Sequence, residues 1–486
     1  MNKNRLSLLF VIVACILLSL QFCPPYDLMS DDKDVFRYAG MLMQKGLVPY
    51  RDMFDHKPPL IFFLNFAALA LGSWGLWLID LGLALLTTIV FFNLCRKRRL
   101  PFPWLLPLLF NLMIRDFLVS PGIGMTREYT CFFQLLFFCV LLGSQRQRHF
   151  WLGSLIALTF FMQQDQLLPL IPFIIYALWT IDTLPIAKRI LRMAAGFATV
   201  TVPVVGYFAL HRTLGAFFEE AFLFNFSVYT TEKQSLDGVF RTLKYKIDAG
   251  NFELPFMVAL VLGLCSLLLP HKKKGLVMAA LAALFLSVCQ EYMNVQAVHS
   301  NFIYYIVPLS ASVCCLLFSV FAYSEEPLLG HWKAQLTYGV LLCTSLAYTA
   351  LQHATHLRRA EIDATPIYSY LRQHPARDYQ LYAFGNSDDL FIYNELNVLA
   401  PSKWIYHHFW KWYPAWDTTN DVLRSIGADL IRHRTTYMIV DSTELATFLH
   451  PASRSWWMSF THKWYEPVTP ADSTGRRLWR LKNISE

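Results

Sequence analysis

Hydrophobic positions fall into long runs that recur from residue 6 to residue 350, and short polar loops separate them. A transmembrane helix needs about 20 consecutive apolar residues. After about residue 358 the long runs stop, and short apolar stretches alternate with polar ones as in a water-soluble domain. The pattern predicts an α-helical polytopic membrane protein with a small soluble domain at its C-terminal end.

The apolar runs predict about eleven transmembrane helices. They lie at residues 6–22, 75–95, 101–119, 129–143, 150–162, 167–181, 193–210, 252–269, 275–290, 302–323 and 336–350. The run at 58–71 is too short to cross, and counting it would move the basic cluster at 96–99 to the outer face. We therefore predict a juxtamembrane helix at 58–72, lying on the outer surface of the membrane.

Basic residues set the predicted orientation. They cluster in short loops at residues 96–99, 146–148, 188–192 and 272–274. Cytoplasmic loops carry such an excess of Lys and Arg. The N-terminus is therefore expected in the cytoplasm and the C-terminal domain in the periplasm. The formal net charge of +8 is explained by these loops, so the lipid bilayer is the predicted partner and nucleic acid is not.

Two domains are predicted. Residues 1–351 form the transmembrane domain, with a first outer loop at 24–57, and residues 352–486 form the C-terminal domain. In that second domain, residues 380–384 and 436–440 have the pattern of strands, residues 417–432 that of a helix, and Gly385-Asn386 that of a turn. A small α/β domain follows. The ten cysteines have no paired spacing and are predicted to fill apolar gaps.

Polar residues of unusual kinds collect in the predicted outer loops. The list includes Asp31, Asp32, Asp34, Arg51, Asp55, His56, Lys57, Arg115, Arg127, Glu128, Asp165, Glu219, Glu220, Asn225 and His299. Ionisable groups near a membrane usually mark function. A phosphate leaving group needs a cation to stabilise its charge, and an acceptor hydroxyl needs a carboxylate base. Both kinds of group occur here beside apolar segments suited to a lipid tail.

The first outer loop resembles that of the GT-C membrane glycosyltransferases. The resemblance is carried by Asp32-Lys-Asp-Val-Phe-Arg-Tyr38 and by Gly46-Leu-Val-Pro-Tyr-Arg-Asp-Met-Phe-Asp-His-Lys-Pro-Pro-Leu60. It is greatest to the bacterial relatives of the dolichyl-phosphate-mannose protein mannosyltransferases and to the aminoarabinose transferases. It continues more weakly at 127–128, 225–229, 299–308 and 381–407, so it touches most of the chain.

The resemblance implies a GT-C-like fold, a sugar donor carried on a polyprenyl phosphate, and inverting transfer at the periplasmic face of a bacterial inner membrane. Asp32 takes the place of the family's catalytic Asp, and Asp31 and Asp34 are near enough to exchange roles with it. Glu128 matches an acidic residue of the second outer loop. Lys57 matches the lysine that contacts the lipid phosphate.

Other residues complete the predicted site. Arg51 and Arg127 are further cations for the donor phosphate, and Tyr304 and Tyr305 are candidate lipid or sugar contacts. His56 stands where aminoarabinose transferases have a Glu implicated in metal binding, with His299 as a candidate partner ligand. The use of a divalent metal ion as cofactor is therefore left open. Each of these side chains also has a plain structural interpretation, as a helix cap, an ion pair or an interfacial anchor.

The predicted function is transfer of one sugar, a hexose or a pentose, from a polyprenyl-phosphate donor to a lipid, glycan or protein acceptor. Two alternatives remain. A transporter or flippase for lipid-linked saccharides would place polar residues deep within its spans. A ligase that transfers a whole glycan en bloc would share the same lipid chemistry.

Overall fold

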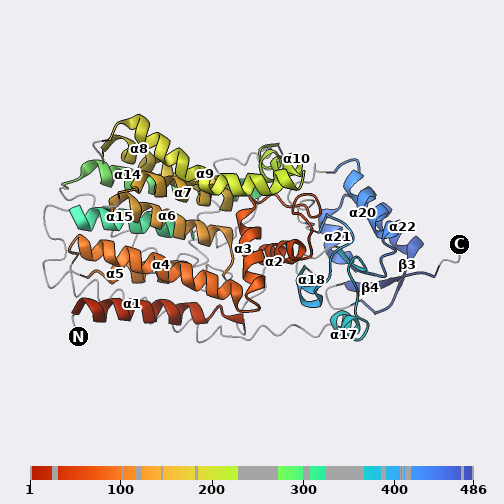
Figure 1. Cartoon of the computed structure of the whole chain (residues 1–486). Helices are drawn as coiled ribbons and strands as arrows, with labels where there is room; N and C mark the ends of the chain where they lie inside the picture. The colour runs from red at the N-terminus through yellow and green to blue at the C-terminus, as the bar shows by residue number, and fades with distance from the viewer. Residues whose placement is uncertain are drawn as a thin grey trace. The chain divides into compact units, whose positions relative to one another are not determined.

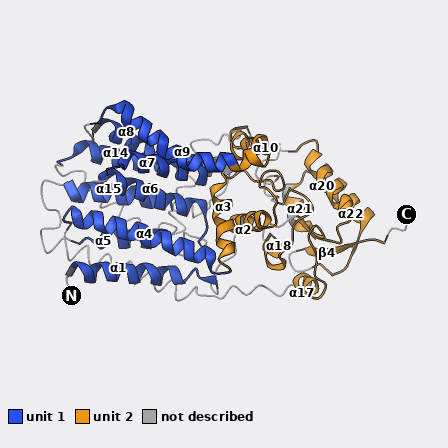
Figure 2. Ribbon diagram, in the orientation of Figure 1, with its two compact units in different colours: residues 1–28, 73–206, 233–359 blue, residues 29–72, 207–232, 360–486 orange. Residues whose placement is uncertain are grey.

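The computed structural model describes most of the chain (Figure 1). The described residues are 3–24, 31–100, 102–115, 123–143, 146–180, 184–227, 272–298, 307–323, 366–384, 390–405, 407, 410, 417–471 and 475–483. They form two compact units, each built from three stretches of the chain (Figure 2). Unit 1 comprises residues 1–28, 73–206 and 233–359, and unit 2 comprises residues 29–72, 207–232 and 360–486.

Unit 1 is a bundle of apolar helices, one of which, Ile186–Leu210, has its last four residues in unit 2. They are α1 (Lys3–Leu20), α4 (Gly75–Lys97), α5 (Leu105–Ile114), α6 (Thr126–Leu142), α7 (Arg148–Met162), α8 (Ile171–Thr180), α9 (Ile186–Leu210), α14 (Lys274–Val298) and α15 (Leu309–Tyr323), with a 3-10 helix η2 (Gln164–Leu170) before α8. Each coincides with a predicted span to within several residues at its ends. The spans predicted at 252–269 and 336–350 lie outside the described residues. Helix α6 lies inside the bundle and contacts α4, α7 and α15.

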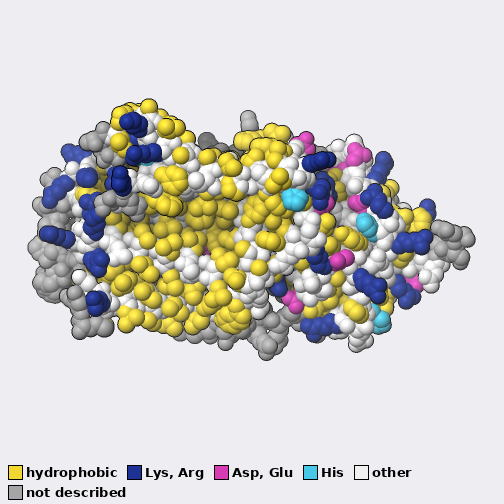
Figure 3. Space-filling model, in the orientation of Figure 1, with side chains coloured by type: hydrophobic (Ala, Val, Ile, Leu, Met, Phe, Trp, Pro, Cys, Tyr) yellow, Lys and Arg dark blue, Asp and Glu magenta, His cyan; other side chains and the backbone are white. Residues whose placement is uncertain are grey.

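The apolar character of unit 1 is visible on its surface. Hydrophobic side chains cover the visible face of its helices, and Lys and Arg gather at the end of the bundle where α1 begins (Figure 3). Among the described helices, Gly75–Lys97 and Ile186–Leu210 are long and apolar enough to cross a membrane, and several others are apolar but shorter. The number of crossings therefore stays a prediction.

The basic residues meet at one end of the bundle. The Arg98 guanidinium and the Lys273 ammonium both lie over the ring of Tyr323, at 5.5 Å and 5.0 Å from its centroid. Arg98 also donates to the carbonyl oxygen of Leu142 at the end of α6, where a cation offsets the helix dipole. Clusters distant in sequence thus share one end of unit 1, as the positive-inside pattern predicts.

Two glycines allow α7 and α9 to touch backbone to backbone. A Cβ at Gly153 would collide with the carbonyl oxygen of Met193, and a Cβ at Gly196 with that of Phe150. Ser154 donates across the contact to the carbonyl oxygen of Gly196 at 3.0 Å. Small residues at such crossings are typical of helices that pack inside a membrane, where close van der Waals contact drives association.

Unit 2 begins with two short helices packed on each other, α2 (Asp31–Gln44) and α3 (Leu60–Ala70). Helix α3 lies within the predicted juxtamembrane segment 58–72. The apolar face of α2 includes Phe36, whose ring packs on that of Phe62 with centroids 6.1 Å apart. A Cβ at Gly40 would lie 2.8 Å from the backbone of Asn65, so only glycine permits this approach.

The short helices α10 (Leu214–Phe218), η3 (Glu219–Leu223) and α11 (Phe224–Ser227) also belong to unit 2, and η3 is a π-helical turn.

The C-terminal sheet has strands β1 (Leu381–Phe384), β2 (Tyr437–Asp441), β3 (Tyr465–Pro467) and β4 (Arg476–Leu481) in the order β1-β2-β4-β3. Strands β1 and β2 are parallel, and the other pairs are antiparallel. The small C-terminal sheet confirms the prediction of strands there.

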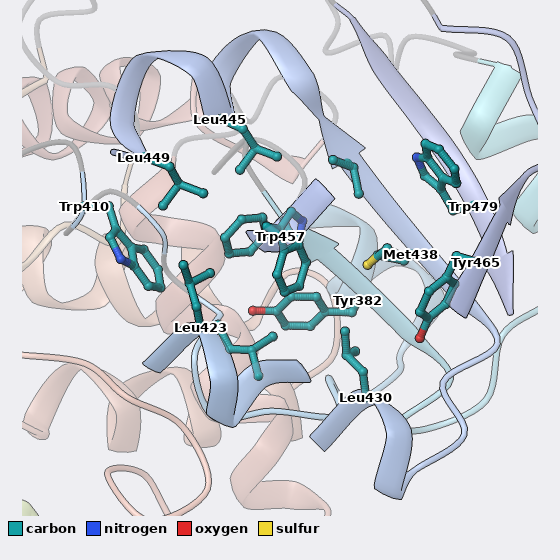
Figure 4. Packing of buried hydrophobic residues seen from close by; sticks show 13 residues of the cluster. Tyr382, Trp410, Leu423, Leu430, Met438, Leu445, Leu449, Trp457, Tyr465 and Trp479 are labelled. Carbon is teal, nitrogen blue, oxygen red and sulfur yellow. The ribbon is translucent and has the colours of Figure 1, made fainter. Parts of the chain in front are cut away.

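Helices surround this sheet: α17 (Pro366–Gln373), α18 (Leu390–Leu396), α20 (Asp421–Arg432), α21 (Ser442–Phe448) and α22 (Pro451–Trp464). Alternate residues of β1 and β2 point into one core with Leu423, Leu430 and Trp457 (Figure 4). Helix α20 begins at Asp421 rather than at the predicted Asp417. The Asp417 carboxylate accepts from the backbone N–H of Val422 at 2.9 Å and so ends the preceding turn. The predicted turn at 385–386 lies outside the described residues.

Candidate functional site

The first loop is folded around Tyr50. Its ring is buried between Phe62, Phe208 and Phe217, with centroids 5.4 to 5.8 Å away. Its hydroxyl donates to the carbonyl oxygen of Lys57 at 2.7 Å. The backbone of Tyr50 has a φ of 69°, a left-handed conformation that is unfavourable for a bulky residue. Burial of the aromatic ring, on the order of 2 kcal/mol, offsets that strain and holds Lys57 at a defined place.

Asp55 also holds the backbone of Lys57, at its N–H group rather than at its carbonyl oxygen. Its Oδ1 accepts from the backbone N–H of Lys57 at 2.9 Å. Burial raises the pKa of Asp55 to about 7, although the Lys57 N–H and ammonium lower it, and the Asp32 carboxylate raises it further. Asp32 and Lys57 are therefore both within electrostatic range of one buried carboxyl group. A carboxyl that titrates near neutral pH is typical of a functional site.

His56 is buried between these groups. Burial, and then the charge of Lys57, hold the pKa of His56 well below 6.5, so its imidazole is neutral at neutral pH. Its Nδ1 lies 3.5 Å from Oδ1 of Asp55, and its carbonyl oxygen accepts from Asn225 Nδ2 at 2.8 Å. A neutral imidazole is the form that binds metal ions. The described residues hold no cluster of three or more His, Cys, Asp or Glu suited to a metal, and His299 lies outside them.

Glu220 lies on the π-helical turn η3, a rare element that often occurs at functional sites. Its Oε1 accepts from Lys403 Nζ of the C-terminal domain at 2.9 Å. Burial raises the pKa of Glu220 to about 8, against the Lys403 ammonium and the N–H of Asp55, which lower it, and with the Asp55 carboxyl, which raises it. Glu220 and Asp55 are thus neighbours, and the charge of Asp55 raises the pKa of Glu220.

The three candidates for the catalytic base, Asp31, Asp32 and Asp34, lie in the first turn of helix α2. Asp32 is half-buried, and Asp34 is buried where its Oδ1 accepts from Asn394 Nδ2 at 3.3 Å. The side chain of Asp31 is outside the described part of the chain. Carboxylates at a helix start are stabilised by its dipole.

Lys57 differs from the other cations of the loop. It is half-buried, and no carboxylate among the described residues forms an ion pair with its ammonium. Arg51, by contrast, is exposed and donates from Nη2 to Asp52 at 2.7 Å. Lys57 is therefore the loop cation that a bound anion can reach without displacing a partner.

The remaining predicted site residues lie elsewhere. Arg127 and Glu128 are buried at the start of α6 in unit 1, where Glu128 pairs with Arg115. Tyr304 and Tyr305 lie outside the described residues. The structure brings together Asp32, Asp34, Arg51, His56 and Lys57 within unit 2.

Sequence reasoning assigned no role to Asp55 or Glu220 beyond the list of polar loop residues, and it did not single out Lys403. Glu220 and Lys403 are 183 residues apart, so no local motif joins them. The available signal for Asp55 was its place two residues before Lys57, which allows a carboxylate to accept from the lysine backbone.

Two solved structures share this architecture. Both are of ArnT from Cupriavidus metallidurans, one bound to undecaprenyl phosphate and one in the apo state. The TM-scores are 0.64 and 0.59 at 11% and 12% sequence identity, over 99% of this chain and 99% and 98% of the ArnT chains. The chain has the ArnT fold.

ArnT is an aminoarabinose transferase of the GT-C class, so the fold predicted from the first loop is confirmed. The match to ArnT extends over the membrane helices and the C-terminal sheet alike. No protein-family model matches the chain, and no curated protein matches it in sequence. The likeness to ArnT is thus one of three-dimensional structure.

Proposed function

We propose that the protein is an inverting glycosyltransferase of a bacterial inner membrane that takes a sugar from a polyprenyl-phosphate donor at the periplasmic face. The observation that carries the proposal is Lys57, a half-buried cation with no ion-pair partner among the described residues, in one unit with the acidic start of α2. The ArnT fold supports it, because one ArnT structure contains undecaprenyl phosphate.

The reaction is a single displacement. Asp32 accepts the proton of an acceptor hydroxyl, and that oxygen attacks C1 of the sugar. The bond between C1 and the phosphate oxygen breaks, and the polyprenyl phosphate leaves with the electron pair. The Lys57 ammonium stabilises the charge that develops on the phosphate. One displacement at C1 inverts its configuration, and Asp32 then returns the proton to water.

Other groups have supporting roles in this proposal. Tyr50 and Asp55 hold the backbone of Lys57 from both sides. A divalent ion, if the enzyme uses one, would be held by His56 with Asp55 beside it, and it would add positive charge near the phosphate.

The test uses the full-length protein purified in detergent and a panel of undecaprenyl-phosphate sugars. We expect release of undecaprenyl phosphate from at least one donor, and a fall of about 100-fold or more in Lys57→Ala, typical of removing one donor to a developing oxyanion. Lys463→Ala, an exposed lysine on α22, is the matched control and should keep full activity. If Lys57→Ala is as active as the wild type, the assignment of Lys57 to the site is wrong.

Two other outcomes favour the alternative functions. Translocation of lipid-linked saccharide in vesicles without turnover favours a flippase, and transfer only of a preassembled glycan favours an en bloc ligase.

A further inference from the structure

One short segment of the C-terminal domain touches both halves of the candidate site. Residues 393–404, here termed the bracket, run from the end of α18 into the turn that follows it. The bracket belongs to unit 2, together with α2 and the first loop. Its contacts with these two elements use different residues.

The first half of the bracket holds α2. Asn394 Nδ2 donates to the carbonyl oxygen of Asp34 at 3.0 Å and to its Oδ1 at 3.3 Å. The backbone N–H of Ala400 donates to the hydroxyl of Tyr38 at 2.9 Å. Both acceptors lie within two turns of Asp32, so these contacts fix the end of the helix that carries the proposed base.

The second half of the bracket holds the loop that carries Lys57. The backbone N–H of Phe54 donates to the carbonyl oxygen of Lys403 at 2.8 Å, and the ring of Trp404 packs on Phe54 with centroids 4.7 Å apart. The Lys403 ammonium donates to Glu220 Oε1 at 2.9 Å. Glu220 lies close enough to Asp55 for the Asp55 carboxyl group to raise its pKa. The bracket thus holds the loop directly at Phe54, and through Lys403 it also holds Glu220, the neighbour of Asp55.

The bracket itself is anchored at both ends to strand β1. The N–H of Ala383 donates to the hydroxyl of Tyr393 at 2.7 Å, and the hydroxyl of Tyr382 donates to the carbonyl oxygen of Trp404 at 2.6 Å. These two residues of β1 are adjacent in the sheet core. Strand β1 therefore holds the bracket near both of its ends, as the support of a reactive site requires.

We infer that the bracket is a positioning element of the transfer reaction, in which Asn394 holds the helix of Asp32 and Lys403 holds the loop of Lys57 at one fixed separation. The inference rests on the proposed function. In the proposed displacement, Asp32 acts on the attacking acceptor oxygen and Lys57 acts on the leaving phosphate, on opposite sides of C1 of the sugar. Small misplacements of such reacting groups lower rates by large factors. The C-terminal domain thereby contributes to turnover without touching the reacting atoms.

The experiment compares Lys403→Met, Lys403→Arg, Asn394→Leu and the double variant Lys403→Met/Asn394→Leu with the wild type. All are full-length proteins in detergent, assayed with whichever undecaprenyl-phosphate sugar the wild type uses. Three quantities are measured: kcat per folded enzyme, donor KM and the affinity for undecaprenyl phosphate. The Lys403 side chain is one-third exposed (33%), so its replacement spares the core. Glu466→Gln, which breaks an exposed pair with Arg480, is the control in the same domain and should behave as wild type.

We expect kcat to fall about tenfold in Lys403→Met and in Asn394→Leu, with the midpoint of thermal unfolding close to wild type, and Lys403→Arg to regain most of the loss. The double variant should lose less than the product of the two single losses, because both act on one separation. A purely structural role would lower the folded fraction and leave kcat per folded enzyme unchanged. Wild-type kcat in both single variants overturns this inference alone, whereas a wild type that turns over no donor overturns the proposed function and the inference together.

Discussion

Unit 1 and unit 2 each contain a cluster of buried carboxyl groups beside basic residues, and the two clusters are built differently. In unit 1, Arg115 uses its two terminal nitrogens to pair with Asp80 of α4 and Glu128 of α6. The side chains of Arg115 and Asp80 are fully buried, with 0% exposed, and that of Glu128 is 2% exposed. Arginine keeps its charge in any protein environment, and its planar fork fits two carboxylates at once.

In unit 2 the acids Asp55 and Glu220 are accompanied by lysines, Lys57 and Lys403. The pKa of Asp55 is raised to about 7 and that of Glu220 to about 8, so protons are exchanged near neutral pH. Lysine is a compact cation whose ammonium turns freely between partners. In the unit 1 cluster every charge is paired and buried. In the unit 2 cluster Lys57 can bind an anion, and the two acids can take up protons near neutral pH.

The largest expected effect is that of removing the proposed base in unit 2. Asp32→Asn keeps the size of the side chain but cannot accept the acceptor proton. We expect kcat to fall by about 10² to 10⁴ with little change in stability. The measurement is release of undecaprenyl phosphate by the purified variant, beside its thermal unfolding curve. A variant that retains more than about a tenth of wild-type kcat would contradict the role of Asp32.

In unit 1 the corresponding change should affect stability instead. Arg115→Met leaves two buried carboxylates without their cation, which typically destabilises by about 3 to 5 kcal/mol. We expect a lower yield of folded protein and a lower midpoint of thermal unfolding in detergent.

The triple variant Arg115→Met/Asp80→Asn/Glu128→Gln sharpens this test, because it removes all three charges together. Stability should largely return, since neutral groups of similar size replace the buried charges. Glu128 was predicted from the sequence as a catalytic acid. If the triple variant is stable but inactive, a charged residue of this cluster takes part in turnover; if it is stable and active, the cluster is structural and Glu128 is not a catalytic acid.

The third expected effect is a pH dependence that belongs to Glu220. A carboxyl whose pKa is raised on folding binds more protons in the folded than in the unfolded state, between its ordinary pKa and about 8. The stability of the protein therefore falls as the pH rises through that window. Glu220→Gln removes this contribution, so the stability of the variant relative to wild type should increase from pH 4.5 to about 8 and level off above that.

Thermal unfolding at several pH values measures this difference. Glu219→Gln, the exposed neighbour on the same π-helical turn, is the matched control. A variant curve parallel to that of wild type would show that Glu220 does not titrate in this range.

The smallest effect is expected at an exposed arginine pair. Arg51 pairs with Asp52 as Arg115 pairs with Asp80, but 46% of the Arg51 side chain is exposed. Exposed pairs contribute about 0 to 1 kcal/mol, so Arg51→Ala should barely change stability. Arg51 was also predicted to bind the donor phosphate. If Arg51→Ala raises the donor KM by more than about tenfold, or about 1.4 kcal/mol, Arg51 binds the donor phosphate. A smaller change would indicate that Lys57, and not Arg51, is the cation of the loop that binds it.

The sequence predicted what depends on local pattern. Apolar runs located the helices of unit 1, alternation located β1 and β2, and the motif around Lys57 located the first loop. Pairing over long distances left no such signal. Arg115 was placed in a polar loop, although it is buried against Asp80, 35 residues earlier. A lone acid such as Asp80 inside an apolar run was the available sign of a buried partner.

The same limit applied to the site. Lys403 lies in an ordinary-looking turn of the C-terminal domain, and its importance comes from contacts with Phe54 and Glu220 that only the folded chain creates.

Unit 2 is assembled from three stretches of chain that are far apart in sequence, and this has a consequence for biosynthesis. Lys45, which directly follows α2, bonds to Asp378, 333 residues later. At a synthesis rate of about 5 to 20 residues per second, α2 waits on the order of tens of seconds for this partner. During that interval the membrane helices of unit 1 can insert and pack, while the first loop has none of its C-terminal contacts. The nascent protein should therefore lack the proposed activity, and be sensitive to proteolysis at the first loop, until the last domain has been delivered to the same side of the membrane.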